Sequence, residues 1–336
     1  MSHPKVQLLL EMLDDMWLTE NWIHPMTQLL DGISVEQATM PIEGCYFSIE
    51  EQINHTSYWE EFARRQLTGE SLEDLRDLQT ATWGKAPDWM PKWPESISYY
   101  RNVRQGIRTA LQEIDPDLLT ETPATDELSR EARMYTRAIH ASYHAGQLFL
   151  QRRLLDLPDP VAELDDVSPE NPEPTEGAGQ LLLDMMDSAW SSGFSIPPFE
   201  TFTKDWTAEQ ADWYPREDLP SSTEMVVHMK FWEDYVCRRL TGQSTEELQK
   251  INSGEVRLIP PSWPEAREDL IRQHEQLRLA LTTFSDTDLV DSNDALGKPF
   301  DAEHHTAQWL VQGIIVHHSY HMGQLMLMRQ LAGDDV

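Results

Sequence analysis

Two short segments of the chain carry histidines at a spacing that suits metal binding. The first is Ile139-His-Ala-Ser-Tyr-His-Ala-Gly-Gln-Leu148, and the second is Val316-His-His-Ser-Tyr-His-Met-Gly-Gln-Leu325. In each segment two histidines lie four residues apart, about one helical turn, so both project from the same face of a helix. Imidazole is a common ligand for zinc and its neighbours. The sequence therefore predicts one metal-binding pair in each segment: His140 with His144, and His317 with His321.

A third histidine recurs upstream, because residues 53–69 align with residues 226–242 and this alignment pairs His55 with His228. If the helix that carries it neighbours the helix with the pair, three neutral imidazoles converge. They would leave a divalent metal at least one open position, as catalytic zinc sites do. The alternative is core histidines satisfied by hydrogen bonds, but the remaining six of the twelve histidines have no partner at the equivalent position. The predicted triads are His55, His140 and His144, and His228, His317 and His321.

The helices that must position these histidines are predicted by the same repeat. Each copy begins with an amphipathic segment, and its second helix is opened by Ser48 or Ser221 and stopped by Gly69 or Gly242. A third helix follows Trp-Pro-Glu at about 94–114 and 264–284, and a fourth holds the His pair at about 130–156 and 306–332. The sequence therefore predicts an all-α protein made of two tandem four-helix bundles.

The connections predict the order of the helices and the limits of the domains. The longest connection joins the second helix to the third, which allows these two to run parallel and favours an up-down-down-up topology. Residues 157–177 are rich in Pro, Asp and Glu, which is typical of a solvated linker. We therefore expect domains at 1–156 and 178–336.

The composition and net charge limit the kinds of molecule that this protein is expected to bind. The chain has 336 residues and a formal net charge of −32, which argues against binding to nucleic acids or to anionic membranes. Two cysteines at non-equivalent positions, the lack of an apolar leader and the lack of a long apolar run favour a cytoplasmic protein. The acidity serves solubility or reflects a salty cytosol; in the second case thermal stability should rise in molar KCl.

The order of the motifs resembles the DinB-like (DinB/YfiT) superfamily. The resembling pattern is a helix-two His followed by Trp-Glu and Leu-x-Gly, then a distant His-x-x-x-His-x-Gly-Gln, and it occurs twice over nearly the whole chain. The resemblance implies up-down-down-up bundles with a divalent metal, often nickel or zinc, on three histidines. Members include thiol-S-transferases using bacillithiol or mycothiol, a maleylpyruvate isomerase, and proteins described as metal-dependent hydrolases. Because the usual form has a single domain, the tandem fusion leaves open whether this chain is a monomer with an internal pseudo-dimer or a homodimer.

The leading functional hypothesis is a metal-dependent enzyme that transfers a low-molecular-weight thiol to an electrophilic small molecule. Zinc or nickel is the expected metal, with iron and manganese as alternatives. Glu60, Glu233, Tyr143 and Tyr320 are weak catalytic candidates. We expect the two glutamates on a solvated face, and the two tyrosines either lining the pocket or packed in the core. Hydrolysis by metal-bound hydroxide and a non-catalytic, stress-associated metal-binding module are the alternatives.

Overall fold

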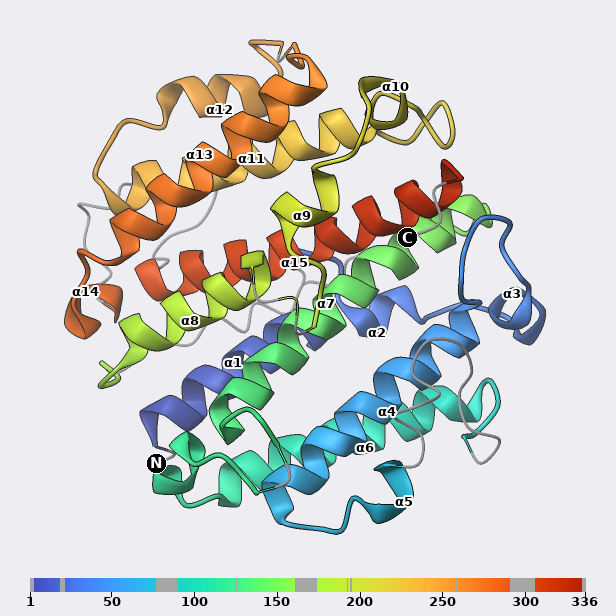
Figure 1. Cartoon of the computed structure of the whole chain (residues 1–336), viewed down its shortest axis with the longest axis vertical. Coiled ribbons are helices and arrows are strands. Elements are labelled where there is room, and N and C mark those ends of the chain that lie inside the picture. The colour runs from blue at the N-terminus through green and yellow to red at the C-terminus, as the bar shows by residue number, and fades with distance from the viewer. Residues whose placement is uncertain are drawn as a thin grey trace.

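The computed structural model describes residues 3–18, 22–76, 90–124, 126–160, 174–191, 193, 195–257, 259–290 and 306–333. The described part is helical, without strands, and forms two four-helix bundles side by side (Figure 1). The first bundle comprises α1 (Pro4–Leu18), α4 (Ile49–Thr68), α6 (Glu95–Glu113) and α7 (Arg130–Leu154). The second comprises α8 (Ala178–Ser191), α11 (Ser222–Leu240), α13 (Trp263–Leu281) and α15 (Ala307–Leu331).

Short helices lie in the connections between the bundle helices. They are α2 (Met26–Leu29), α3 (Val35–Thr39), α5 (Glu73–Arg76), the 3₁₀ helix η2 (Pro116–Thr120), α9 (Phe199–Thr203), α10 (Ala208–Ala211), α12 (Glu246–Asn252) and α14 (Asp286–Val290). Of the predicted linker 157–177, residues 161–173 lie outside the described part of the chain.

The helices begin and end where local side chains satisfy the terminal backbone groups. Ser48 and Ser221 each accept a hydrogen bond from the backbone three residues on, and a glutamate at that position bonds back, which completes a capping box. Ser129 opens α7 in a similar way. At the other end of α4, Gly69 adopts φ 75°, the left-handed conformation that glycine accepts without strain. The predicted boundaries of the second and fourth helices are therefore confirmed.

The second and third helices of the first bundle run parallel, as the long connection predicts. At the start of both helices, Oε2 of Glu50 accepts a hydrogen bond of 2.5 Å from the backbone N–H of Trp93. Further along both, Nη1 of Arg104 lies 2.9 Å from Oε1 of Glu60. Because α1 and α7 run in the opposite direction, the topology is up-down-down-up (Figure 1).

The two bundles meet where α7 packs against α15. A Cβ atom at Gly146 would lie 1.8 Å from the backbone oxygen of Tyr320, and a Cβ at Gly323 would lie 1.8 Å from that of Tyr143. Only glycine allows so close an approach, and the two contacts are reciprocal. These glycines belong to the repeated Gly-Gln step, so the same motif that follows each His pair also joins the two bundles.

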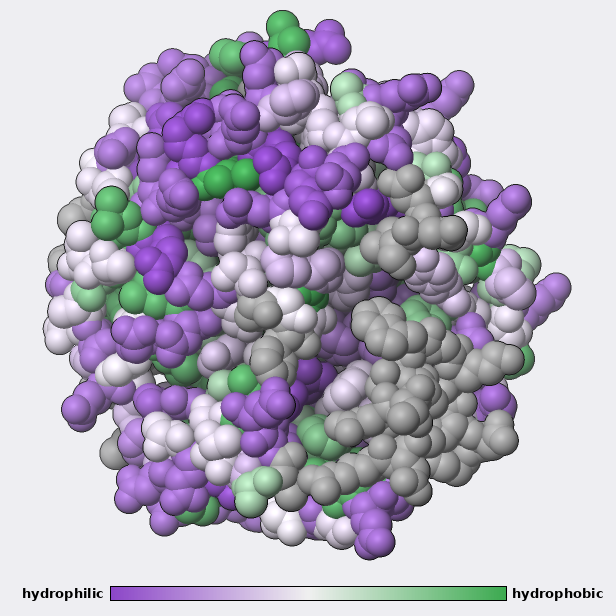
Figure 2. All heavy atoms as spheres, viewed as in Figure 1, coloured by the Kyte–Doolittle hydropathy of each residue, from purple (hydrophilic) through white to green (hydrophobic). Residues whose placement is uncertain are grey.

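The face of the molecule in Figure 2 is largely hydrophilic among the described residues. None of the described helices is both long enough and apolar enough to cross a membrane.

Candidate metal centres

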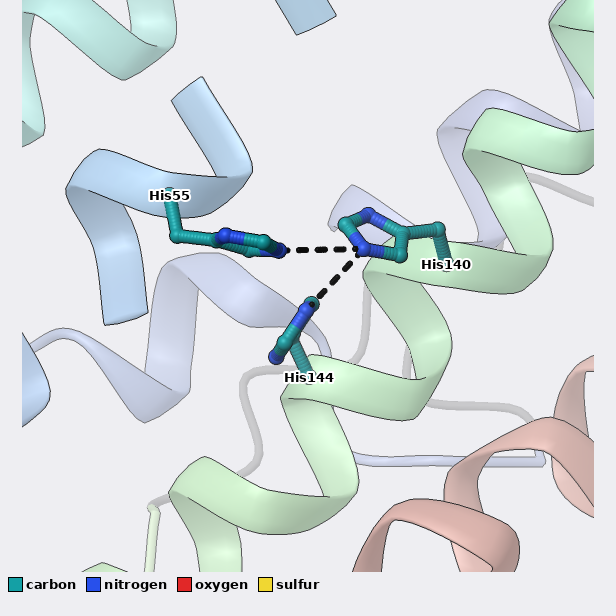
Figure 3. A group of neighbouring side chains, drawn as sticks. All are labelled: His55, His140 and His144. Atoms are coloured by element: carbon teal, nitrogen blue, oxygen red, sulfur yellow. Dashed lines mark hydrogen bonds between the residues drawn. The ribbon is translucent and has the colours of Figure 1, made fainter. Parts of the chain in front are cut away.

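The structure brings the first predicted triad together. His55 projects from α4 toward His140 and His144 on α7 (Figure 3). Nε2 of His140 lies 3.3 Å from Nε2 of His55 and 3.1 Å from Nε2 of His144. Three ring nitrogens thus converge on one site, as the spacing of the histidines predicts.

The second triad repeats this geometry in the other bundle. Nε2 of His317 on α15 lies 3.2 Å from Nε2 of His228 on α11 and 3.1 Å from Nε2 of His321. In each triad, one potential ligand atom per histidine lies within 4.8 Å of the others, so each group could hold a metal ion. The two sites differ in exposure, because His228 is exposed whereas His55 is partly buried.

The glutamine of the repeated motif orients the last histidine of each triad. Oε1 of Gln147 lies 2.8 Å from Nδ1 of His144, and Oε1 of Gln324 lies 2.7 Å from Nδ1 of His321. An amide oxygen only accepts hydrogen bonds, so Nδ1 must carry the proton and Nε2 must present its lone pair. This glutamine is part of the repeated motif, but its contact with the histidine is evident only from the structure.

The surroundings keep the rings neutral, which is the form that binds a metal. Burial, followed by the charge of Arg137, lowers the pKa of His55 to about 4. Burial is also the main cause that holds the pKa values of His140 and His144 well below the ordinary range. The three Nε2 atoms converge, and neutral imidazoles that carry their protons on Nδ1 would direct three lone pairs at a cation between them. The donor set therefore fits a divalent metal.

The expectation that Glu60 and Glu233 lie on a solvated face is wrong. Their side chains are buried, with 1 % and 2 % of the surface exposed. Glu60 pairs with Arg104, whereas Oε1 of Glu233 lies 3.2 Å from Nδ1 of His274. Arg104 and His274 occupy equivalent positions, each eleven residues after the Trp of Trp-Pro-Glu. Such pairing offsets the cost of burying a carboxylate. The partner side chain lies on another helix, so the sequence around each glutamate does not predict the pairing.

Each tyrosine candidate lies with its ring edge-on to the last histidine of its triad, but the two differ in their other neighbours. Tyr143 lines the cavity beside the first triad, where its ring lies edge-on to that of His144. Burial raises the pKa of the Tyr143 hydroxyl, so the phenol is neutral. Tyr320 packs in the apolar core beside Phe149 of the first bundle. Tyr143 therefore meets the expectation of a pocket residue, and Tyr320 has the core position that was its alternative.

A cavity of about 1150 Å³ adjoins the first triad and is built from both halves of the chain. His55, His140 and His144 line it together with the aromatic side chains Phe47, Trp59 and Phe62. Residues 195–197 and Met326, Leu327 and Gln330 enter its wall from the second half. Cys45 also lines the cavity, but burial raises its pKa to about 12, so this thiol is protonated at neutral pH and is a poor nucleophile.

A tryptophan from the first half packs beside the second triad. The ring centroid of Trp22 lies 5.9 Å from that of His317 and 5.7 Å from that of Trp232. A Cβ atom at Gly313 would lie 1.9 Å from Nε1 of Trp22, so the glycine makes room for the indole. By the repeat offset of 173, Trp22 corresponds to Ser195, which lines the cavity at the first triad. Each half therefore contributes the residue at this position, Trp22 or Ser195, to the surroundings of the other half's triad.

Comparison with known families assigns both halves to one group. The sequence profile described as the DinB superfamily matches residues 18–148 and again residues 198–325. No curated protein and no solved structure matches the chain.

Proposed function

Since the chain belongs to the DinB superfamily, we propose that it is a metal-dependent enzyme that transfers a low-molecular-weight thiol to an electrophilic small molecule. The observation that supports this proposal most directly is the first triad: three converging Nε2 atoms at the wall of a cavity of about 1150 Å³. The six histidines of the two triads would hold the metal ions, with zinc or nickel as the expected occupants.

A divalent metal with an open position lowers the pKa of a thiol bound to it, which supplies a nucleophile at neutral pH. The chain's own groups serve binding. Gln147 fixes the ring of His144, and the aromatic wall of Phe47, Trp59 and Phe62 suits an apolar electrophile. Glu60 pairs with Arg104 and is not among the side chains that line this cavity. Because a metal-bound thiol needs no side-chain base to become a nucleophile, thiol transfer requires fewer groups from this site than hydrolysis does.

The test combines metal analysis with a turnover assay. Protein purified without an affinity tag should contain close to two equivalents of a first-row metal, and the double variant His144→Ala, His321→Ala should contain none. With the metal-replete protein, a panel of small thiols and 1-chloro-2,4-dinitrobenzene should show enzyme-dependent loss of thiol and electrophile in equal amounts.

A Cys45→Ser variant is the matched control, because Cys45 lines the same cavity and could itself react with the electrophile. We expect this variant to keep full turnover. A metal-replete protein that turns over none of the thiols would refute the transferase proposal. A protein that binds no metal and is unchanged in stability by the histidine substitutions would refute both metal centres.

A further inference from the structure

A buried arginine in the cavity wall has no carboxylate hydrogen-bonded to it among the described residues. Arg137 lies on α7 one turn before His140, and only 4 % of its surface is exposed. Its Nη2 lies 3.2 Å from the hydroxyl of Ser195, and its guanidinium carbon lies 5.5 Å from the ring centroid of Trp59. Within the described part of the chain, its Nε and Nη1 atoms are buried without a hydrogen-bond partner.

The neighbouring charges are already matched. Arg104 pairs with Glu60, and Arg133 forms an ion pair with Asp126. Glu60 also acts on Arg137 through its charge, but one carboxylate cannot neutralise both Arg104 and Arg137. These residues therefore leave one positive charge in excess beside the first triad.

Keeping this charge is costly for the folded protein in the absence of a ligand. Burial is the main cause that lowers the pKa of Arg137 to about 9, so the guanidinium is still protonated at neutral pH. A buried charge with unused donors is unfavourable unless something pairs with it. An anionic group in the cavity would supply that pair, and a planar guanidinium is well suited to a carboxylate.

We propose that Arg137 binds the carboxylate of a substrate whose reacting atom lies at the first triad. The inference rests on the proposed function only for the identity of the reacting partners, because the anion-binding role follows from the cavity and the unmatched charge. The carboxylate belongs either to the thiol or to the electrophile, and Ser195 from the second half helps to hold the guanidinium in place.

This preference is confined to the first site. The residue three positions before His317, equivalent to Arg137, is Ile314. Ser195 is likewise replaced at the second site by Trp22, whose indole packs on His317. The second triad therefore has neither the cation nor the small hydroxyl residue, and we expect it to show no preference for anions.

The test is equilibrium binding to the zinc-loaded protein, measured by calorimetry. One pair of probes is 3-mercaptopropionate and its neutral amide, and a second pair is acrylate and acrylamide. A His321→Ala background restricts metal loading to the first site, and metal content and unfolding temperature are measured for every variant. We expect the acid of one pair to bind at least about tenfold more tightly than its amide, in line with a charge-assisted hydrogen bond.

In Arg137→Gln this preference should vanish while the neutral probe binds as before, and Arg137→Lys should keep part of it. The pair that shows the preference assigns the carboxylate to the thiol or to the electrophile. No charge preference in the parent protein, or a preference that survives in a metal-loaded Arg137→Gln variant, would overturn the inference. Binding with the expected preference but without turnover would instead count against thiol transfer alone.

Discussion

At the scale of single residues, the most informative contact is the one between each glutamine of the repeated motif and the histidine three residues before it. The hydrogen bond to Nδ1 selects the tautomer in which Nε2 faces the other two rings. Partners of this kind orient metal ligands and are often worth one to two orders of magnitude in metal affinity. Each glutamine therefore orients the last histidine of a triad without belonging to the triad.

Replacing Gln147 with Leu should lower the metal affinity of the first site by about 10- to 100-fold, because His144 loses the acceptor that fixes its tautomer. Competition with a chelator of known affinity measures this change. The second site provides an internal control, since Gln324 still bonds to His321 in the same molecule. Equal weakening of both sites, or of neither, would contradict the role that we assign to Gln147.

The buried histidines also predict how the metal-free protein responds to pH. The folded pKa of His55 is about 4, against an ordinary value of 6.5, and those of His140 and His144 are also lowered, so between these pH values the unfolded chain binds more protons than the folded one. The free energy of unfolding should therefore fall as the pH falls from 6.5 toward 4, by up to about 1.4 kcal/mol per pH unit for each such histidine.

Denaturant titrations of the metal-free protein at several pH values measure this slope. In the variant His140→Gln, His144→Gln the slope should be shallower, because two of the contributing imidazoles are gone. A slope that is unchanged in this variant would mean that other groups dominate the acid response.

At the scale of helices, the crossing of α7 and α15 links the architecture to the sites. The close approach at Gly146 and Gly323 occurs two residues after His144 and His321, respectively. Each helix therefore reaches the other bundle close to the turn that carries two histidines of its triad. Any change in the distance between these two helices should shift the histidines of both triads.

A Gly146→Ala substitution should lower the free energy of unfolding by about 1–3 kcal/mol or more, because its methyl group would meet the rigid backbone oxygen of Tyr320. It should also reduce metal binding. Thermal unfolding and metal analysis test both effects. Gly106→Ala is the matched control, since its methyl group would meet only the flexible side chain of Arg64. A mild effect at Gly146, equal to that at Gly106, would show that the helices can separate without cost.

The sequence predicts contacts between residues that are close along the chain better than contacts between distant residues. The caps at Ser48 and Ser221 and the histidine triads were predictable, because their residues lie within one helix or recur in register in both copies. The burial of Glu60 was not, since it depends on Arg104 from a helix reached after a long connection. Contacts between the two halves, such as that of Trp22 with His317, cannot be predicted when each repeat is considered separately.

At the scale of the whole molecule, the net charge of −32 is the dominant property. Like charges repel more strongly in the compact state than in the unfolded chain, and salt screens them, with a Debye length of about 3 Å at 1 M. If the acidity is an adaptation to a salty cytosol, the unfolding temperature should therefore rise by several degrees between about 0.1 M and about 2 M KCl. Differential scanning calorimetry of the metal-loaded protein tests this, and a flat or falling response would show that repulsion among surface carboxylates does not limit stability.

The exchange of Trp22 and Ser195 between the halves has a consequence for how this protein could diversify. In a homodimer, a residue that reaches into the neighbouring subunit's pocket is encoded once and must appear at both pockets. Fusion of two copies in one chain removes that constraint, so one triad can keep a small hydroxyl nearby, beside Arg137, while the other acquires an indole. The duplicated chain thus allows the surroundings of the two triads to change independently of each other.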